Sequence, residues 1–206
     1  MSGQSTRPSA VFLDRDGVVI RDVGYLRSAA GIRLLPGAAR AIRRLNHAGI
    51  PVVIVTNQSA VARGWLSLQA LDAIHAELKR RLARSGARLD AIYFCPHHPT
   101  EAVGSFRVEC DCRKPNPGML IRAARELGFR LSDAVIIGDK PSDLEVGRRA
   151  GCRTVLVLSG EGAGTLRGLN AAGLTHLADA IFATFPKAID WCLGTPALQQ
   201  EPRPRS

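Results

Sequence analysis

The chain has 206 residues, of which 46% are hydrophobic and 22% are charged, a composition typical of soluble globular proteins. It contains no apolar run near the roughly 20 residues that a membrane-spanning helix needs, and its N-terminus lacks the basic-then-apolar layout of a secretory signal. We therefore expect a cytoplasmic protein without a membrane partner. The net charge of +10 is scattered over arginines of several predicted helices, without a continuous basic run, so nucleic-acid binding is not expected.

Short apolar runs alternate along the chain with segments of helical periodicity. Strands are predicted at residues 11–13, 52–55, 91–94, 134–137 and 154–158, and helices at residues 37–48, 67–85, 117–127 and 141–150. This alternation indicates an α/β fold, a Rossmann-like parallel sheet with helices on both faces. We expect residues 1–193 to form one domain and the Pro- and Gln-rich residues 194–206 to be a disordered tail.

The second predicted helix carries one apolar stripe. Its members are Leu68, Leu71, Ile74, Leu78 and Leu82. The stripe predicts the face that packs on the sheet. His75 lies beside it, and we expect His75 to be a helix-surface residue with no chemical role.

Several predicted strands end in polar residues. The strand at residues 11–13 leads directly into Asp14 and Asp16, the second strand ends at Thr56, and the fourth leads to Asp139. Ligands of parallel sheets bind at the carboxyl ends of the strands, and gathered carboxylates there suit Mg²⁺. Asp14 and Asp16 fall on the same side if the extended path continues, although an isolated Asp-x-Asp-Gly is more simply a turn.

A cysteine-rich loop spans residues 95–112. An odd total of five cysteines argues against a disulfide framework, whereas Cys95, His97, Cys110 and Cys112 together suit a tetrahedral zinc site. His98 is an alternative to His97, which we prefer because the C-x-H and C-x-C pairs then mirror one another. Free thiols with a turn histidine are the simpler alternative, but four soft ligands in one loop favour zinc, and no position is left for a reactive water.

Four segments, in this order, resemble the motifs of the haloacid-dehalogenase-like phosphatase superfamily. They are "FLDRDGVVI", "VVIVTNQS", "CRKPNPGM" and "VIIGDKPSDLEVG". Within that superfamily the zinc loop resembles the D-glycero-D-manno-heptose 1,7-bisphosphate 7-phosphatases and their relatives, the histidinol-phosphate phosphatases. Twelve residues separate His97 from Cys110, the longer loop of the heptose group. No long insertion interrupts the chain, so we expect no large cap domain and a mouth closed by residues 22–28, residues 59–65 and the zinc loop.

The resemblance implies a role for each motif residue. Asp14 would be the nucleophile that forms an aspartyl-phosphate, and Asp16 the general acid and base. Thr56 and Lys114 would hold the phosphoryl oxygens. The implied Mg²⁺ ligands are Asp14, the backbone carbonyl of Asp16, and Asp139, supported by Asp143. The expected substrate contacts are Asp22, Gly24, Tyr25, Asn57, Gln58, Ser59, Arg113 and Lys140.

The expected function is that of a monomeric, Mg²⁺-dependent phosphatase acting on a heptose bisphosphate. A histidinol-phosphate phosphatase is the nearest alternative. A non-catalytic, zinc-stabilised binding module is a further alternative. Such a module would not need the complete set of Asp14, Asp16, Thr56, Lys114 and Asp139.

Five positions bear on substrate choice. Arg113 is expected to meet the distal phosphate rather than form a surface ion pair, and Trp65 either lines the mouth or packs beside it. The chain departs from the heptose group at Ile20, where Asn is usual, and at Ala60 and Val61, where Gly-Ile is common. Both departures are expected near the mouth, where they would affect specificity.

Overall fold

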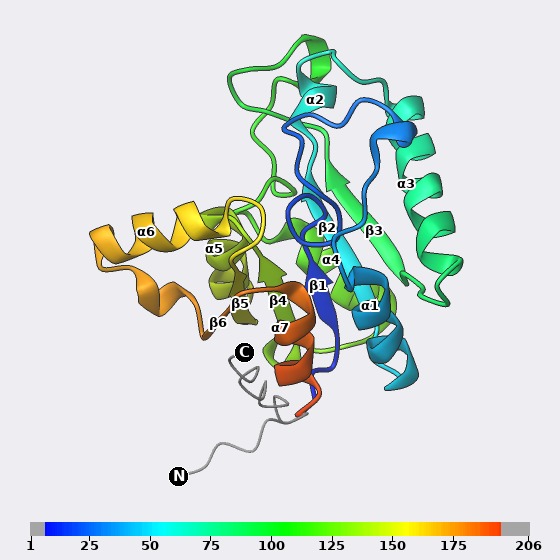
Figure 1. Cartoon of the computed structure of the whole chain (residues 1–206). Coiled ribbons are helices and arrows are strands. Elements are labelled where there is room, and N and C mark those ends of the chain that lie inside the picture. The colour runs from blue at the N-terminus through cyan, green and yellow to red at the C-terminus, as the bar shows by residue number, and fades with distance from the viewer. Residues whose placement is uncertain (1–6, 195–206) are drawn as a thin grey trace, which may run out of the picture.

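The computed structural model describes residues 7–194, which surround one six-stranded sheet whose strand pairings are all parallel. The strands are β1 (Val11–Leu13), β2 (Val52–Asn57), β3 (Ala91–Cys95), β4 (Val135–Gly138), β5 (Arg153–Val157) and β6 (Ala180–Phe182). Their order is β3-β2-β1-β4-β5-β6, with β1 in the centre (Figure 1). The predicted Rossmann-like sheet is therefore confirmed. Except for Gly194, the expected tail lies outside the described residues.

The helices are α1 (Ala38–His47), α2 (Ser59–Ala62), α3 (Leu68–Ala83), α4 (Gly118–Leu127), α5 (Pro141–Ala150), α6 (Gly162–Ala172) and α7 (Phe185–Cys192). Short 3-10 turns lie at Ala29–Gly31, Gly104–Phe106, Leu131–Asp133 and Thr175–Leu177. The four predicted helices correspond to α1, α3, α4 and α5. The sequence analysis missed α2, α6, β6 and α7. Helix α2 has only four residues, α6 is rich in glycine, and β6 is a short, half-exposed strand. No helix among residues 7–194 combines the length and the apolar character needed to cross a bilayer.

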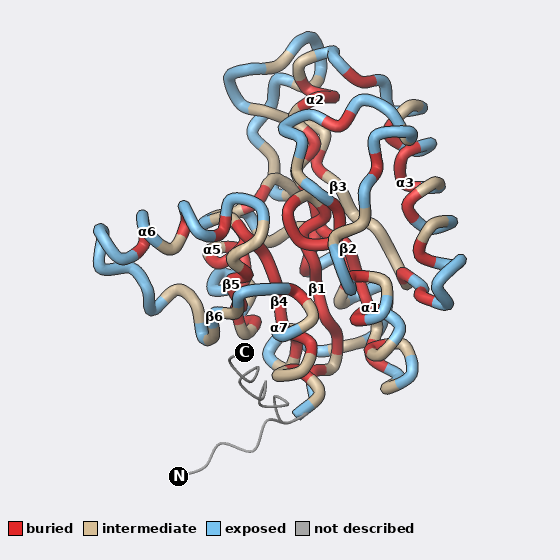
Figure 2. Tube along the Cα trace, in the orientation of Figure 1, coloured by how far each residue is buried: buried red, intermediate tan, exposed pale blue. Residues whose placement is uncertain are grey.

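Helices cover both faces of the sheet, as predicted. Val11 and Leu13 of β1 face the cluster that includes α1, α3 and α7, whereas Phe12 faces the cluster formed with α4 and α5. This alternation follows from the two-residue period of a strand. The central strands are buried on both sides, as Figure 2 shows in red. Their continuous apolar sequences are thus explained by the packing of a parallel sheet.

The chain reverses its direction of travel across the sheet at β1. From β1 it proceeds to β2 and β3 on one side, and it then returns to place β4 on the other side (Figure 1). The backbone N–H of Asp14 still donates to the carbonyl of Ile137 on β4, at 3.0 Å. Such a switch point leaves a crevice at the carboxyl ends of the strands, where parallel sheets bind ligands.

Candidate active site

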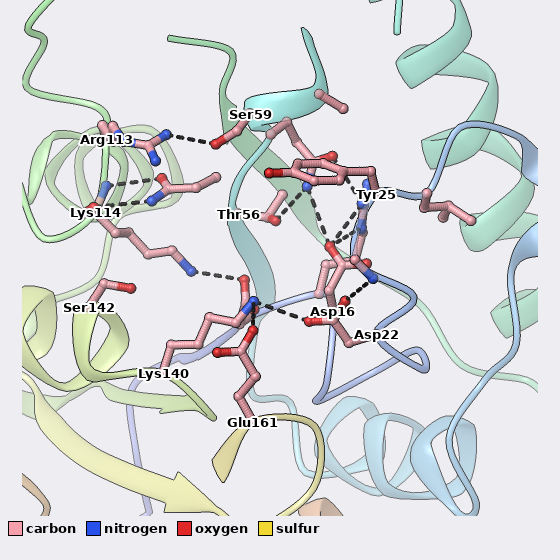
Figure 3. A pocket seen from close by; sticks show the side chains of 17 residues that line it. Asp16, Asp22, Tyr25, Thr56, Ser59, Arg113, Lys114, Lys140, Ser142 and Glu161 are labelled. Atoms are coloured by element: carbon pink, nitrogen blue, oxygen red, sulfur yellow. Dashed lines mark hydrogen bonds and ion pairs between the residues drawn. The ribbon is translucent and has the colours of Figure 1, made fainter. Parts of the chain in front are cut away.

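A pocket of about 340 Å³ opens at this switch point (Figure 3). It is lined by every residue predicted to be catalytic or to contact substrate: Asp14, Asp16, Asp22, Gly24, Tyr25, Thr56, Asn57, Gln58, Ser59, Arg113, Lys114 and Lys140. The lining also includes five residues that were not predicted as catalytic or substrate-contacting, of which Leu26 and Ala60 belong to segments expected at the mouth: Arg15, Leu26, Ala60, Ser142 and Glu161. The pocket therefore collects side chains from loops that follow different strands.

Lys114 is buried at the base of the pocket and is paired with two carboxylates. Its Nζ lies 2.8 Å from Oδ1 of Asp14 and 2.6 Å from Oδ1 of Asp143, and it also donates to the carbonyl of Val55 at 2.9 Å. Burial alone lowers the pKa of Lys114, but the two carboxylates outweigh it and raise the pKa above its ordinary value. The lysine is thus a fixed positive charge beside Asp14.

The backbone of Lys114 is held by Asn57. The Asn57 side chain donates to the carbonyl of Lys114 and accepts from its N–H, both at 3.0 Å. This reciprocal pair joins the end of β2 to the loop before α4. Asn57 lines the pocket, but its side-chain hydrogen bonds orient the lysine loop.

Three carboxylates form a possible cation site. One oxygen from each of Asp14, Asp139 and Asp143 lies within 4.8 Å of the others. Asp139 is fully buried; its Oδ2 accepts from the N–H of Glu161 at 2.8 Å, whereas its Oδ1 has no partner among the described residues. Burial, with the charge of Asp14, raises the pKa of Asp139 to about 7. Hard oxygen ligands and an unpartnered buried oxygen fit Mg²⁺.

The chain turns immediately after Asp14, so the extended path considered for Asp14 and Asp16 does not continue. The N–H groups of Val19 and Ile20 both donate to the carbonyl of Arg15, and Gly17 adopts a positive φ of 84°. A Cβ at Gly17 would lie 2.1 Å from Oδ2 of Asp139, so only glycine fits there.

As a result, the Asp16 carboxylate faces Arg15 and Gln58 instead of the carboxylate cluster. Burial raises the pKa of Asp16, an effect that the Arg15 charge opposes and the Asp14 charge reinforces. A raised pKa favours the protonated form that a general acid needs.

The prediction that His75 lies on the helix surface was wrong. His75 is only 7% exposed, and its Nε2 lies 3.3 Å from Nη1 of Arg15. Leu68 of the stripe, the first residue of α3, is 43% exposed. The buried face of α3 is the predicted one, since Leu71, Ile74, Leu78 and Leu82 are all buried, and it also includes His75.

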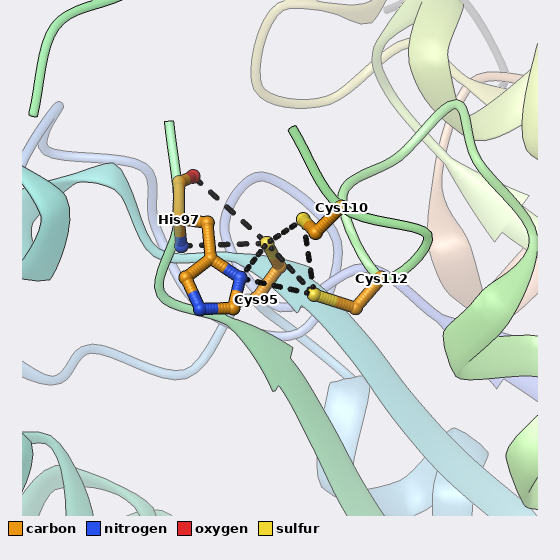
Figure 4. Close-up of side chains that lie close together, drawn as sticks. All are labelled: Cys95, His97, Cys110 and Cys112. Atoms are coloured by element: carbon orange, nitrogen blue, oxygen red, sulfur yellow. Dashed lines mark hydrogen bonds between the residues drawn. The ribbon is translucent and has the colours of Figure 1, made fainter. Parts of the chain in front are cut away.

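The thiol and imidazole side chains of the zinc loop lie together at the end of β3 (Figure 4). The Sγ of Cys112 is 3.2 Å from the sulfurs of Cys95 and Cys110, and 3.4 Å from Nδ1 of His97. The Sγ of Cys95 lies 3.6 Å from that of Cys110 and 3.9 Å from Nδ1 of His97. Ligands of a tetrahedral zinc ion lie roughly 3.8 Å apart, so a small adjustment of these side chains around the ion would complete the site. His98 lies outside the cluster, where its Nδ1 accepts from the N–H of Glu101 at 2.9 Å.

Comparisons with known proteins agree with this geometry. Residues 11–84 match the family model of haloacid dehalogenase-like hydrolases, and residues 111–182 match a second model, described as HAD-hydrolase-like. The chain is 40% identical over 188 residues to the D-glycero-D-manno-heptose-1,7-bisphosphate 7-phosphatase of Thermosynechococcus vestitus, which covers 88% of this chain and 94% of that protein. The chain belongs to this phosphatase family.

Two further relatives support membership of the heptose bisphosphate phosphatase family. The D-glycero-beta-D-manno-heptose-1,7-bisphosphate 7-phosphatase of Yersinia pestis is 40% identical over 183 residues, covering 87% of this chain and 94% of that protein. A solved D,D-heptose 1,7-bisphosphate phosphatase from B. bronchiseptica, complexed with magnesium and phosphate, has a TM-score of 0.79 and 36% identity, covering 90% and 98% of the two chains. The predicted haloacid-dehalogenase-like fold and the predicted class, a phosphoric monoester hydrolase, are confirmed.

Two positively charged side chains, Arg113 and Lys140, lie at the rim of the pocket of this phosphatase in different surroundings. Arg113 donates from Nη1 to the carbonyl of His97 at 2.9 Å and to Oγ of Ser59 at 3.2 Å, two uncharged partners. The Nζ of Lys140 lies 3.1 Å from Asp22 and 3.2 Å from Glu161. Arg113 therefore faces the pocket without an ion-pair partner among residues 7–194, whereas two carboxylates balance Lys140.

Aromatic and basic side chains join the three segments expected to close the mouth. Tyr25 and Trp65 make an edge-to-face contact at 4.8 Å, and the Arg63 guanidinium lies over both rings. Arg63 also pairs with Glu101 of the zinc loop. Trp65 packs behind Tyr25 and does not itself line the pocket.

The departures from the group's pattern fall in two different environments. Ile20 is 1% exposed and belongs to the core, so the expectation that it lies at the mouth was wrong. Ala60 does line the pocket, whereas its neighbour Val61 packs in the core.

Proposed function

We propose that this member of the family is a Mg²⁺-dependent phosphatase that removes the 7-phosphate of D-glycero-D-manno-heptose 1,7-bisphosphate. The observation that carries the proposal is the convergence of Asp14, Asp16, Thr56 and Lys114 on one pocket at the carboxyl ends of the strands. Relatives that cover nearly the whole chain are named for this activity, and one solved relative holds magnesium and phosphate.

Each catalytic side chain is assigned a step. Asp14 attacks phosphorus and becomes an aspartyl-phosphate, while Asp16 gives a proton to the leaving alcohol and later takes one from the hydrolytic water. Lys114 and Thr56 stabilise the charge on the phosphoryl oxygens. Mg²⁺, when bound, neutralises charge between the carboxylates and the phosphate. We assign it to Asp14, the backbone carbonyl of Asp16, and Asp139, with Asp143 in support.

The substrate contacts are assigned to the rim. Arg113 meets the distal phosphate or the sugar as a bidentate donor, and Lys140 adds a second positive charge. Further contacts are assigned to Asp22, Gly24, Tyr25, Asn57, Gln58 and Ser59. Support for these assignments comes from the position of every one of these residues on the pocket wall.

The remaining proposals concern the state of the protein. The cluster of Cys95, His97, Cys110 and Cys112 holds a structural zinc ion that takes no part in bond breaking. We propose that residues 1–193 form one domain and that the protein is cytoplasmic. We also propose that it is a monomer, and light scattering coupled to gel filtration would test the oligomeric state of the purified chain.

The decisive experiment measures phosphate release from a substrate panel in the presence of Mg²⁺. The substrate panel comprises both anomers of D-glycero-D-manno-heptose 1,7-bisphosphate, histidinol phosphate and a small sugar monophosphate. We expect the highest kcat/KM with one anomer of the bisphosphate. A preference for histidinol phosphate would overturn the heptose assignment, and no hydrolysis of any phosphate ester would overturn the catalytic one.

A further inference from the structure

Arg15, between the two catalytic aspartates, is the largest fully buried side chain of the described residues. Its Nη2 lies 2.9 Å from Oδ2 of Asp16 and 2.9 Å from Oε1 of Gln58. Its Nη1 lies 3.3 Å from Nε2 of His75 on α3. A buried guanidinium is costly unless its N–H groups have acceptors, so each of these partners constrains where Arg15 sits.

His75 serves Arg15 as a neutral acceptor. Burial, with the charges of Arg15 and Lys79, lowers the pKa of His75 to about 3, so its ring is uncharged at pH 7. Arginine has no acceptor atom, and therefore the hydrogen bond runs from Arg15 Nη1 to the Nε2 lone pair. The ring packs 5.5 Å from the ring of Phe94, centroid to centroid, which limits its rotation.

The same guanidinium reaches two groups of the site. On one side it holds the Asp16 carboxylate, and on the other it holds Gln58, whose Nε2 donates to Oγ1 of Thr56 at 2.8 Å. Loss of the His75 acceptor would leave one N–H of the buried Arg15 side chain unpaired. The guanidinium would then shift to find another partner, and Asp16 would shift with it.

We infer that His75 is a positioning residue for phosphoryl transfer, which acts through Arg15 to aim the Asp16 carboxyl group at the leaving oxygen. The inference rests on the proposed role of Asp16 as general acid. In that step an oxygen of Asp14 forms a bond to phosphorus while the bond from phosphorus to the leaving oxygen breaks. The electron pair of the broken bond stays on the leaving oxygen, which takes the Asp16 proton.

The inference is testable because the need for a proton depends on the leaving group. A sugar alcohol leaves only when protonated, whereas p-nitrophenolate leaves without help. The parameter to compare is kcat/KM, which covers the steps up to phosphoryl transfer to Asp14 and excludes the later hydrolysis of the aspartyl-phosphate. A misplaced Asp16 therefore lowers kcat/KM for a heptose bisphosphate and leaves kcat/KM for p-nitrophenyl phosphate nearly unchanged.

The experiment uses three variants and one reference, in the full-length protein with Mg²⁺. His75→Leu removes the acceptor and His75→Gln retains one, while Ile74→Val perturbs the same buried face of α3 and leaves the acceptors of Arg15 in place. Asp16→Asn is the reference for loss of the general acid. We expect His75→Leu to lose roughly tenfold to a hundredfold on the bisphosphate and less than about twofold on p-nitrophenyl phosphate. His75→Gln should recover most of the loss, and Ile74→Val should match wild type on both.

Each contrary result has a distinct meaning. Equal losses on both substrates for His75→Leu, or no loss on either, would overturn the positioning role. Failure of His75→Gln to recover activity that His75→Leu loses would show that the hydrogen bond to Arg15 is not the cause. If Asp16→Asn lost activity equally on both substrates, the assignment of Asp16 as general acid would be overturned, whatever the His75 variants show.

Discussion

Arg113 donates a hydrogen bond of 2.9 Å to the backbone carbonyl of His97, a member of the thiol–imidazole cluster. Arg113 also follows Cys112 directly in the chain and lines the pocket. The cluster therefore positions the Arg113 side chain in two ways: through the peptide bond to Cys112 and through the hydrogen bond to His97. The proposed zinc ion would hold both ends of this loop and so keep Arg113 in place without burying it.

Cys110→Ser should lose the zinc ion and destabilise the protein. We expect elemental analysis to give about one zinc per chain for wild type and much less for the variant, with a free energy of unfolding lower by at least about 2 kcal/mol. Because Arg113 is tied to the cluster, KM for the bisphosphate should also rise. Cys192→Ala is the control, since this buried thiol lies on α7 and should leave the zinc content unchanged. A zinc-free wild type with reactive thiols at Cys95, Cys110 and Cys112 would refute the site.

Arg113→Ala should impair the enzyme selectively. A charge-assisted hydrogen bond is worth about 1.5–3 kcal/mol, so we expect kcat/KM for the heptose bisphosphate to fall roughly tenfold to a hundredfold. A small sugar monophosphate lacks the distal group and should be affected far less. Arg107→Ala, an exposed arginine of the same loop, is the matched control. If both substrates lose equally, Arg113 does not determine specificity.

Asp14→Asn should abolish turnover and leave the fold intact. An amide is not a nucleophile for phosphorus, and Lys114 keeps its second carboxylate partner, Asp143, at 2.6 Å. Phosphate release and circular dichroism measure the two effects, with Asp72→Asn on the exposed side of α3 as the control. Residual activity within about a hundredfold of wild type would contradict the assignment of Asp14.

His75 should make the folded state sensitive to acid. Its pKa falls from 6.5 to about 3 on folding, mainly through burial, so between these pH values the unfolded chain binds a proton that the folded chain excludes. The free energy of unfolding is therefore unaffected by the protonation of His75 above about pH 6.5. Below that pH it falls by up to about 1.4 kcal/mol per pH unit as the pH decreases toward 3. Urea unfolding at pH 7.5 and 5.5 should therefore show a larger decrease for wild type than for His75→Leu. Parallel decreases would mean that the folded ring takes up the proton freely.

Much of the site is encoded locally. Asp14, Thr56 and Asp139 each follow a buried apolar run, and the carboxyl ends of parallel strands meet at one edge of the sheet. Strand periodicity and the order of the motifs were therefore enough to predict that these residues gather at one place: Asp14 and Thr56 line the pocket, and Asp139 joins Asp14 in the carboxylate cluster. The spacing of Cys110 and Cys112 likewise predicted a compact ligand set, since a ligand pair two residues apart needs no distant partner to point the same way.

The tertiary structure decided how the charges are paired. No sequence pattern links Arg15 to His75, sixty positions apart, or Lys114 to Asp143, and both pairs form only because separate elements pack around β1. The sequence argument placed His75 on the surface because a polar residue beside an apolar stripe is ordinarily exposed, and the contact with Arg15 that accompanies its burial comes from a distant segment. Burial sets the cost of an unpaired charge, and burial is a property of the packed molecule. The chain thus specifies its catalytic groups locally, while their orientation and protonation depend on contacts between distant segments.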